Sequence, residues 1–297
     1  MTNNLHIESF FHDGTGTWTY VVHRTGDGGD HDAVVIDPVL DYDPKSGKVD
    51  IASLRVVQDY IAEKHLRVYR ILETHAHADH LSSAQVLRAT TGATVGIGEG
   101  IRKVQDHFAG VFGIERDDTA LRDAFDVTYS DGEVIEAGSL RLTVLATPGH
   151  TSDCLSYAIE GHVFIGDTLF APDVGCARCD FPGGSVDDLY ASIQRLYAMD
   201  DATVLHLCHD YPPASRERRS EVSVGESKRD NRMLRADTSL EEFRQARLAR
   251  DATLPAPTLL YPSLQVNIRG GRLPPPHSNG QRYLCTPVQG DLPTTLD

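Results

Sequence analysis

The chain has 297 residues, of which 40% are hydrophobic and 24% are charged, and this is the composition of an ordinary globular protein. A formal net charge of −15 with no clearly basic stretch argues against nucleic acid as a partner. No run of about 18 apolar residues indicates a membrane span, and the N-terminus lacks the pattern of a secretory signal. With an odd number of cysteines, five, we expect free thiols and a cytoplasmic location.

Strands and helices are predicted in chain order from hydrophobic periodicity. Residues 49–66, 81–92, 99–110 and 185–199 have helical spacing; we expect Asp50 to cap the first of these helices and Gly92 to end the second. The predicted strands cover residues 6–11, 17–23, 32–38, 67–73, 93–98, 125–130, 133–137, 139–147, 154–160, 162–167 and 203–210. This order predicts an α/β fold of two packed sheets with helices outside.

The character of the chain changes after Asp210. A further helix is predicted to end near Ala236, and the next is expected to begin with a capping box formed by Thr238 and Glu241. The last 43 residues are rich in proline and low in periodicity. We therefore interpret residues 1–297 as a single domain, with 211–297 a helical and extended C-terminal region packed on it.

The stretch THAHADH, residues 74–80, places three histidines and an aspartate within a few positions: His75, His77, Asp79 and His80. A helix would scatter these side chains, whereas a tight loop can bring them together. The flanking segments predict such a loop between a strand and a helix, at the strand end where α/β proteins tend to place ligand sites. Four candidate ligands in one loop predict a metal site.

Three more candidate ligands stand where apolar strands are predicted to end: His150, Asp167 and His209. Strand ends gather at one edge of a sheet, so we expect these residues to join the loop. Imidazole and carboxylate together suit zinc, iron or manganese. The other histidines are expected to be structural or surface residues.

In order and spacing, THAHADH, TPGHT, GDTLF and His209 resemble the metallo-β-lactamase superfamily, over roughly residues 5–210. The resemblance implies an αβ/βα sandwich of two mixed sheets flanked by helices, with the metal site at one edge. The superfamily contains hydrolases, nucleases and dioxygenases, so the fold alone does not decide the reaction.

Residues 166–185, GDTLFAPDVGCARCDFPGGS, resemble the persulfide dioxygenases, although Cys179 stands where threonine is usual in the human-type sequence. The segments LQVNIRGGRLPPP and DPVLDYDPKSG are similar to the bacterial β-lactamase-hydrolase-like branch. The resemblance implies oxidation of glutathione persulfide by O₂ to sulfite and glutathione, in sulfide detoxification. It also implies one Fe(II) per chain held by His75, His150 and Asp167.

Under this interpretation the remaining four residues would orient the iron ligands and waters: His77, Asp79, His80 and His209. The alternative is a glyoxalase II-like thioester hydrolase with two zinc or iron ions. Asp167 would then bridge the two ions, and Asp79, His80 and His209 would hold the second. A persulfide sensor without turnover and a homodimeric assembly also stay open.

Two further residues are predicted to contact the substrate. Arg178 is expected to bind a glutathione carboxylate, because a protein this acidic needs a local cation for an anionic substrate. The alternative is an ion pair of Arg178 with Asp173 or Asp180. Cys176 is expected near the substrate sulfur, or else as a structural thiol, and strand alternation is expected to turn Cys208 away from the metal.

Overall fold

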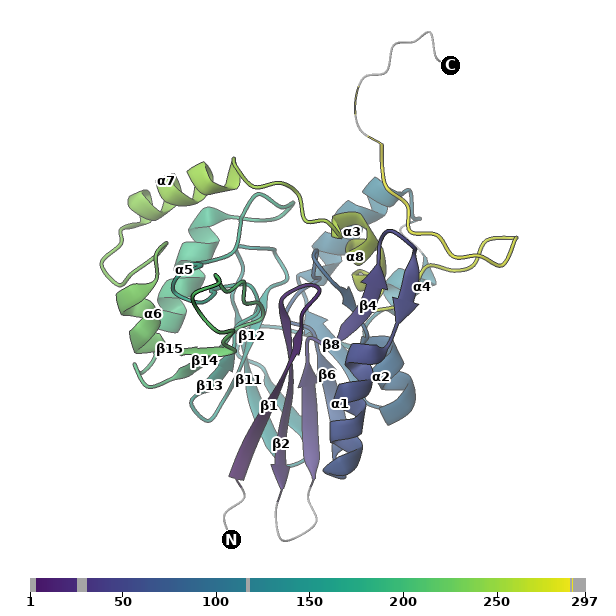
Figure 1. Cartoon of the computed structure of the whole chain (residues 1–297), viewed down its shortest axis with the longest axis horizontal. Coiled ribbons are helices and arrows are strands. Elements are labelled where there is room, and N and C mark those ends of the chain that lie inside the picture. Colours follow the sequence, from purple (N-terminus) through teal and green to yellow (C-terminus); the bar gives the residue numbers. More distant parts are fainter. Residues whose placement is uncertain (1–3, 26–30, 116–117, 289, 291–297) are drawn as a thin grey trace.

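The computed structural model describes residues 4–25, 31–115, 118–288 and 290. Its centre is formed by two mixed β-sheets packed face to face, with helices covering the outer face of each sheet (Figure 1). This is the αβ/βα sandwich that the sequence predicts. Among the described residues, no helix combines the length and the apolar character needed to cross a membrane.

The first sheet, which we call the N-terminal sheet, has the strand order β1-β2-β3-β6-β8-β9. Strands β1, β2 and β3 pair antiparallel, and β3, β6, β8 and β9 pair parallel. Their bounds are β1 Asn4–His12, β2 Thr17–Thr25, β3 Asp32–Ile36, β6 Arg67–Leu72, β8 Thr94–Gly98 and β9 Val127–Tyr129. A small sheet beside it has the order β5-β4-β7, with β4 Val39–Asp43, β5 Lys48–Asp50 and β7 Leu81–Ser82.

The second sheet, the C-terminal sheet, has the order β10-β11-β12-β13-β14-β15. All its neighbours are antiparallel except β13 and β14, which run parallel. The bounds are β10 Val134–Ala137, β11 Leu140–Ala146, β12 Leu155–Ile159, β13 His162–Phe164, β14 Val204–His206 and β15 Glu221–Ser223.

The helices form the two outer layers. Four helices and the C-terminal α8 lie on the N-terminal side: α1 Ala52–Glu63, α2 Ala84–Thr91, α3 Ile101–Phe112, α4 Thr119–Arg122 and α8 Leu260–Asn267. The C-terminal sheet is covered by α5 Val186–Tyr197, α6 Val224–Asp230 and α7 Leu240–Asp251 (Figure 1). Residues 211–290 thus contribute helices to both outer layers.

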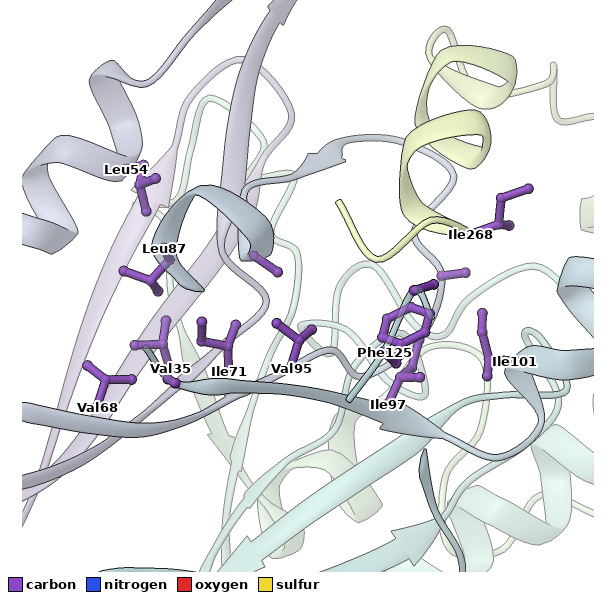
Figure 2. Close-up of a cluster of buried hydrophobic side chains, with 14 of the residues drawn as sticks. Val35, Leu54, Val68, Ile71, Leu87, Val95, Ile97, Ile101, Phe125 and Ile268 are labelled. Carbon is purple, nitrogen blue, oxygen red and sulfur yellow. The ribbon is translucent and has the colours of Figure 1, made fainter. Parts of the chain in front are cut away.

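Alternating side chains of the strands build separate hydrophobic cores. In β3, Val34 and Ile36 face the core between the two sheets, whereas Ala33 and Val35 face the helices. A strand buried on both faces is the pattern expected for the middle of a layered α/β fold. The core under α1, α2 and α3 also takes in Ile268, at the end of α8 (Figure 2). The C-terminal region is therefore part of the packed body.

The two sheets are joined by backbone contacts where the candidate metal residues lie. The start of β2 pairs with the segment after β14 through an antiparallel bridge between Thr17 and His209. Beside it, the amide of Trp18 donates to the carbonyl of Cys208 over 2.7 Å. These contacts fix His209 against the N-terminal sheet.

Two of the predicted helix caps are wrong in detail. Ile51, not Asp50, occupies the N-cap of α1, and Asp41 of β4 accepts the Ser53 amide over 2.9 Å. The capping box of α7 is formed by Ser239 and Glu242, one residue later than predicted. The predicted stop of α2 is confirmed, because Gly92 ends it with a φ of 72°.

We predict that Ile268→Ala destabilises the protein by about 2–5 kcal/mol, because it deletes a fully buried side chain that ties α8 to the core. Val56→Ala on the exposed face of α1 is the control and should change stability by less than about 0.5 kcal/mol. Chemical denaturation of both variants measures this difference. Equal stability of the two variants would contradict the packing of α8 described here.

Candidate metal centre

The loop between β6 and β7, residues 73–80, carries the first four candidate ligands. His75, His77 and His80 are at most 1% exposed. Buried carboxylates hold the start of the loop: Asp37 accepts the Thr74 amide over 2.7 Å, and Asp153 accepts the Ala76 amide over 2.8 Å. The loop is irregular in backbone and is fixed by side chains from distant segments.

His75, His150 and Asp167 form one group at this edge, with one potential ligand atom of each within 4.8 Å of the others. Nε2 of His75 and Nε2 of His150 lie 3.9 and 3.7 Å from Oδ2 of Asp167. Those distances exceed a hydrogen bond and leave room for an ion between the atoms. Gly166 allows Asp167 to reach the group, since its φ is 51° and a Cβ would lie 2.8 Å from Thr74.

The other four predicted residues form a second group beside the first: His77, Asp79, His80 and His209. Nε2 of His209 lies 3.2 Å from Asp79 and 3.4 Å from Asp167, so His209 links the two groups. All seven predicted ligands therefore meet at one site. This arrangement has the donor atoms for one ion or for two.

Several buried ligand atoms of the site have no hydrogen-bond partner in the described part of the chain. They are Nε2 of His75, Nδ1 of His77, Nε2 of His80, Nε2 of His209 and Oδ1 of Asp167. Such groups are costly to bury unless something else satisfies them. A divalent metal ion bound by imidazole and carboxylate would do so.

The opposite nitrogens of two of these rings, and one nitrogen of His150, are held by the protein. Nδ1 of His150 donates to the carbonyl of Arg178 over 2.7 Å, and Nδ1 of His75 and of His209 contact threonine hydroxyls at 3.1 and 3.2 Å. Such contacts orient metal-binding histidines and leave the other nitrogen available as a ligand. The site thus has the form expected of a metal centre.

Burial decides the charge of two rings. It lowers the pKa of His75 well below the usual value and that of His80 to about 4, and neighbouring His77 adds to both effects. Both imidazoles are therefore neutral near pH 7 and offer a lone pair. For His77 burial acts in the same direction, but the carboxylates of Asp37 and Glu73 outweigh it and raise its pKa.

A cavity of about 760 Å³ opens onto the metal centre, and His150, Asp79 and Asp167 form part of its wall. Four arginines also line it: Arg178, Arg232, Arg247 and Arg250. Its two aspartates both belong to the metal groups. The wall of the cavity therefore carries four guanidinium groups, in a protein whose overall charge is −15.

Arg178 lines the cavity, and its guanidinium forms an ion pair with Asp180, as the alternative interpretation predicts. Its Nε and Nη2 donate to both carboxylate oxygens over 2.6 and 2.7 Å, and Nη1 donates to the carbonyl of Pro255 over 2.6 Å. Contact of Arg178 with a substrate carboxylate stays a prediction. The nearby Phe181 ring packs edge-on against His150, with 5.2 Å between ring centroids.

Cys176 also lines the cavity, and it is buried beside Arg247, whose Nη1 lies 3.8 Å from its sulfur. Burial raises the pKa of Cys176 to about 11, although Arg247 acts against this. Cys179 is buried too, and its pKa is raised by the same cause. Both are neutral thiols at physiological pH.

Sequence reasoning missed Asp37 and placed Cys208 wrongly. Asp37 accepts hydrogen bonds from Thr74 and contacts Nε2 of His77 at 3.0 Å. It follows an apolar strand just as Asp167 does, and that signal could have found it. Cys208 lies beyond the end of β14, where alternation no longer applies. Its sulfur lies 3.6 Å from Asp37 and within 4.8 Å of potential ligand atoms of Asp167 and His209.

Comparison with known proteins agrees with this geometry. The model of the metallo-β-lactamase superfamily matches residues 12–209. A probable metallo-hydrolase of Burkholderia pseudomallei is 41% identical over 292 residues, covering 95% of this chain and 98% of that protein. A β-lactamase hydrolase-like protein of Agrobacterium fabrum is 42% identical over 95% of this chain, but the chain spans only 64% of that relative.

The persulfide dioxygenases are also related to this chain. The human mitochondrial persulfide dioxygenase ETHE1 is 28% identical over 86% of this chain and 84% of its own. The crystal structure of ETHE1 from Myxococcus xanthus superposes with a TM-score of 0.71 and 30% identity, covering 90% of this chain and all of that one. The chain belongs to the metallo-β-lactamase superfamily, with β-lactamase hydrolase-like proteins and ETHE1 persulfide dioxygenases among its homologues.

Proposed function

We propose that the protein is a persulfide dioxygenase, which oxidises glutathione persulfide with O₂ to sulfite and glutathione. Membership of the superfamily and the metal-type site support an enzyme of the hydrolase or dioxygenase class. The dioxygenase is the more specific proposal. It gives the protein a role in sulfide detoxification and requires one Fe(II) per chain.

The observation that carries this proposal is the position of residues 175–181. This segment, which resembles the persulfide dioxygenases, contributes Cys176, Ala177, Arg178 and Phe181 to the wall of the cavity that His150 also lines. It also fixes that histidine directly, through the carbonyl of Arg178 and the ring of Phe181. A motif of the dioxygenase family thus shapes both the substrate cavity and a candidate iron ligand.

The group formed by His75, His150 and Asp167 has the donor set of mononuclear Fe(II) oxygenases, two imidazoles and one carboxylate. An ion held by these three residues would supply open coordination positions for a persulfide sulfur and O₂. His150 and Asp167 both line the cavity, so a substrate bound there would lie next to such an ion. The residues of the second group would hold the ligands and waters in place.

The cavity suits an anionic carrier such as glutathione. Arg178 and Arg247 are paired with Asp180 and Asp251, respectively. By contrast, the side chain of Arg250 has no hydrogen-bond or ion-pair partner among the residues that the structure describes. A free guanidinium on the wall can bind a substrate carboxylate. We therefore assign carboxylate recognition to Arg250 in preference to Arg178.

The second candidate is a thioester hydrolase with two metal ions. It is favoured by the unpaired nitrogens of His77, His80 and His209, because a second ion would satisfy them all. In that enzyme Asp79 would bind the second ion and Asp167 would bridge the pair. The name of the Burkholderia relative is also that of a hydrolase.

Substrate turnover separates the two candidates. The iron-loaded protein should consume O₂ in step with sulfite formation from glutathione persulfide, and it should leave a glutathione thioester intact. His150→Ala, which removes a ligand, should retain little iron and show neither reaction. Hydrolysis of the thioester without O₂ uptake on the persulfide would overturn the proposal.

Asp79→Asn tests the number of ions. With one ion, Asp79 acts by orienting its neighbours, so the variant should keep its single iron and lose about 10–100-fold in activity. Metal analysis of wild type and variant, purified in parallel, measures this. A fall from two ions per chain to about one would instead support the two-metal hydrolase.

Arg250→Ala and Arg178→Ala test the carboxylate assignment. Loss of one charged hydrogen bond from Arg250 should raise KM for glutathione persulfide about tenfold, with little change for a small persulfide that has no carboxylate. Arg178→Ala should slow both substrates alike, since it removes the ion pair with Asp180 that holds the segment whose backbone carbonyl accepts a hydrogen bond from His150. Steady-state kinetics with both substrates decides. If only Arg178→Ala raises KM selectively, Arg178 is the carboxylate-binding residue.

A further inference from the structure

The buried side chain of Asn267, in the C-terminal helix α8, contacts the metal loop. Nδ2 of Asn267 donates to the carbonyl of His77 over 2.7 Å and to the carbonyl of His80 over 2.8 Å. Its Oδ1 accepts the amide of Ser82 over 2.8 Å. Both N–H protons of this amide therefore donate to loop carbonyls, and its oxygen accepts a backbone amide of β7.

These backbone groups depend on Asn267. Residues 77–80 lie outside regular secondary structure, so their carbonyls have no strand or helix partner. Leaving a buried acceptor unsatisfied costs about 1–3 kcal/mol. Asp37 and Asp153 hold the backbone amides of Thr74 and Ala76 in the first part of the loop, whereas Asn267 holds backbone carbonyls in its second part.

Asn267 is itself held in a fixed place. The next residue, Ile268, is fully buried in the core of the N-terminal side (Figure 2). The carbonyl of Ile268 accepts a hydrogen bond from Nε2 of Gln105 in α3 over 2.8 Å. Since α3 and the core hold this end of α8, the amide of Asn267 is a rigid support and not a mobile surface group.

We propose that Asn267 is a positioning residue of the metal centre. By fixing the carbonyls of His77 and His80, it sets the direction of the side chains between and beside them, including Asp79. The C-terminal region, beyond the part of the chain that matches the superfamily model, thereby completes the metal site. This inference rests on metal binding and not on which reaction the enzyme performs.

The same helix provides a matched control, Gln265. Its Nε2 donates to the carbonyls of Tyr261 and Cys285, and its Oε1 accepts the amide of Cys285. Gln265 and Asn267 are both 4% exposed, and each amide holds two carbonyls and one backbone N–H. Only Asn267 holds the metal loop. Gln265→Glu and Asn267→Asp therefore make the same chemical change at equal burial.

The test compares metal release from the anaerobic Fe(II)-loaded protein to an excess of a chromogenic chelator. Asn267→Asp loses donors to both loop carbonyls, so iron should leave about 10–100-fold faster than from the wild type. Gln265→Glu should release iron at the wild-type rate, even if its melting temperature falls as much as that of Asn267→Asp. Equal release rates for Asn267→Asp and Gln265→Glu would overturn the proposal.

A second pair covers the case in which the buried carboxylate prevents folding. Asn267→Ser and Gln265→Ser remove the same contacts without adding charge, and they are compared in the same assay. Replacement of iron by Co²⁺ adds a spectroscopic readout, because the visible absorption of Co²⁺ reports ligand geometry. A changed spectrum for Asn267→Ser alone supports the proposal, and an unchanged one contradicts it. Failure of turnover in the wild type would refute the proposed reaction but leave this result unaffected.

Discussion

Buried ligand atoms without a protein partner are the constraint on which the rest of this structure depends. Four imidazole nitrogens and a carboxylate oxygen converge on buried side chains at the end of the cavity. Burying these atoms without a hydrogen-bond partner costs free energy, and binding of a metal ion would offset that cost. The opposite nitrogens of these imidazoles have fixed partners in the protein, such as the Thr17 hydroxyl at Nδ1 of His209.

The layered fold serves this constraint by supplying rigid supports from both sheets and from the C-terminal region. The start of β2 and the segment after β14 are joined next to His209, so the two sheets cannot separate at the site. The loop after β6 is held by hydrogen bonds to side chains and not by the regular backbone hydrogen bonds of a strand. That leaves its histidines free to turn inward and lets the cavity wall at 175–181 contact His150.

Local sequence patterns were sufficient for the layers and for the seven candidate ligands, because periodicity and strand ends are local signals. They failed where a partner comes from far along the chain. Near the start of α1, Asp41 of β4 accepts the Ser53 amide. Thr238 and Ser239 both precede a glutamate by three residues, and the hydroxyl of Thr238 accepts the Arg235 amide, which leaves Ser239 as the cap of α7. The pairing of Arg178 with Asp180, two residues along the chain, was one of the two alternatives, but its contact with the carbonyl of Pro255 depends on the folded C-terminal region.

The central claim is that one metal ion occupies the group formed by His75, His150 and Asp167. Anomalous diffraction from crystals of the iron-loaded protein, recorded at the iron edge, tests it most directly. The account predicts a single peak within bonding distance of these three residues, with His80 and His209 turned toward water or substrate. Two peaks about 3.5–4 Å apart, the second beside Asp79, would contradict it and identify a two-metal hydrolase.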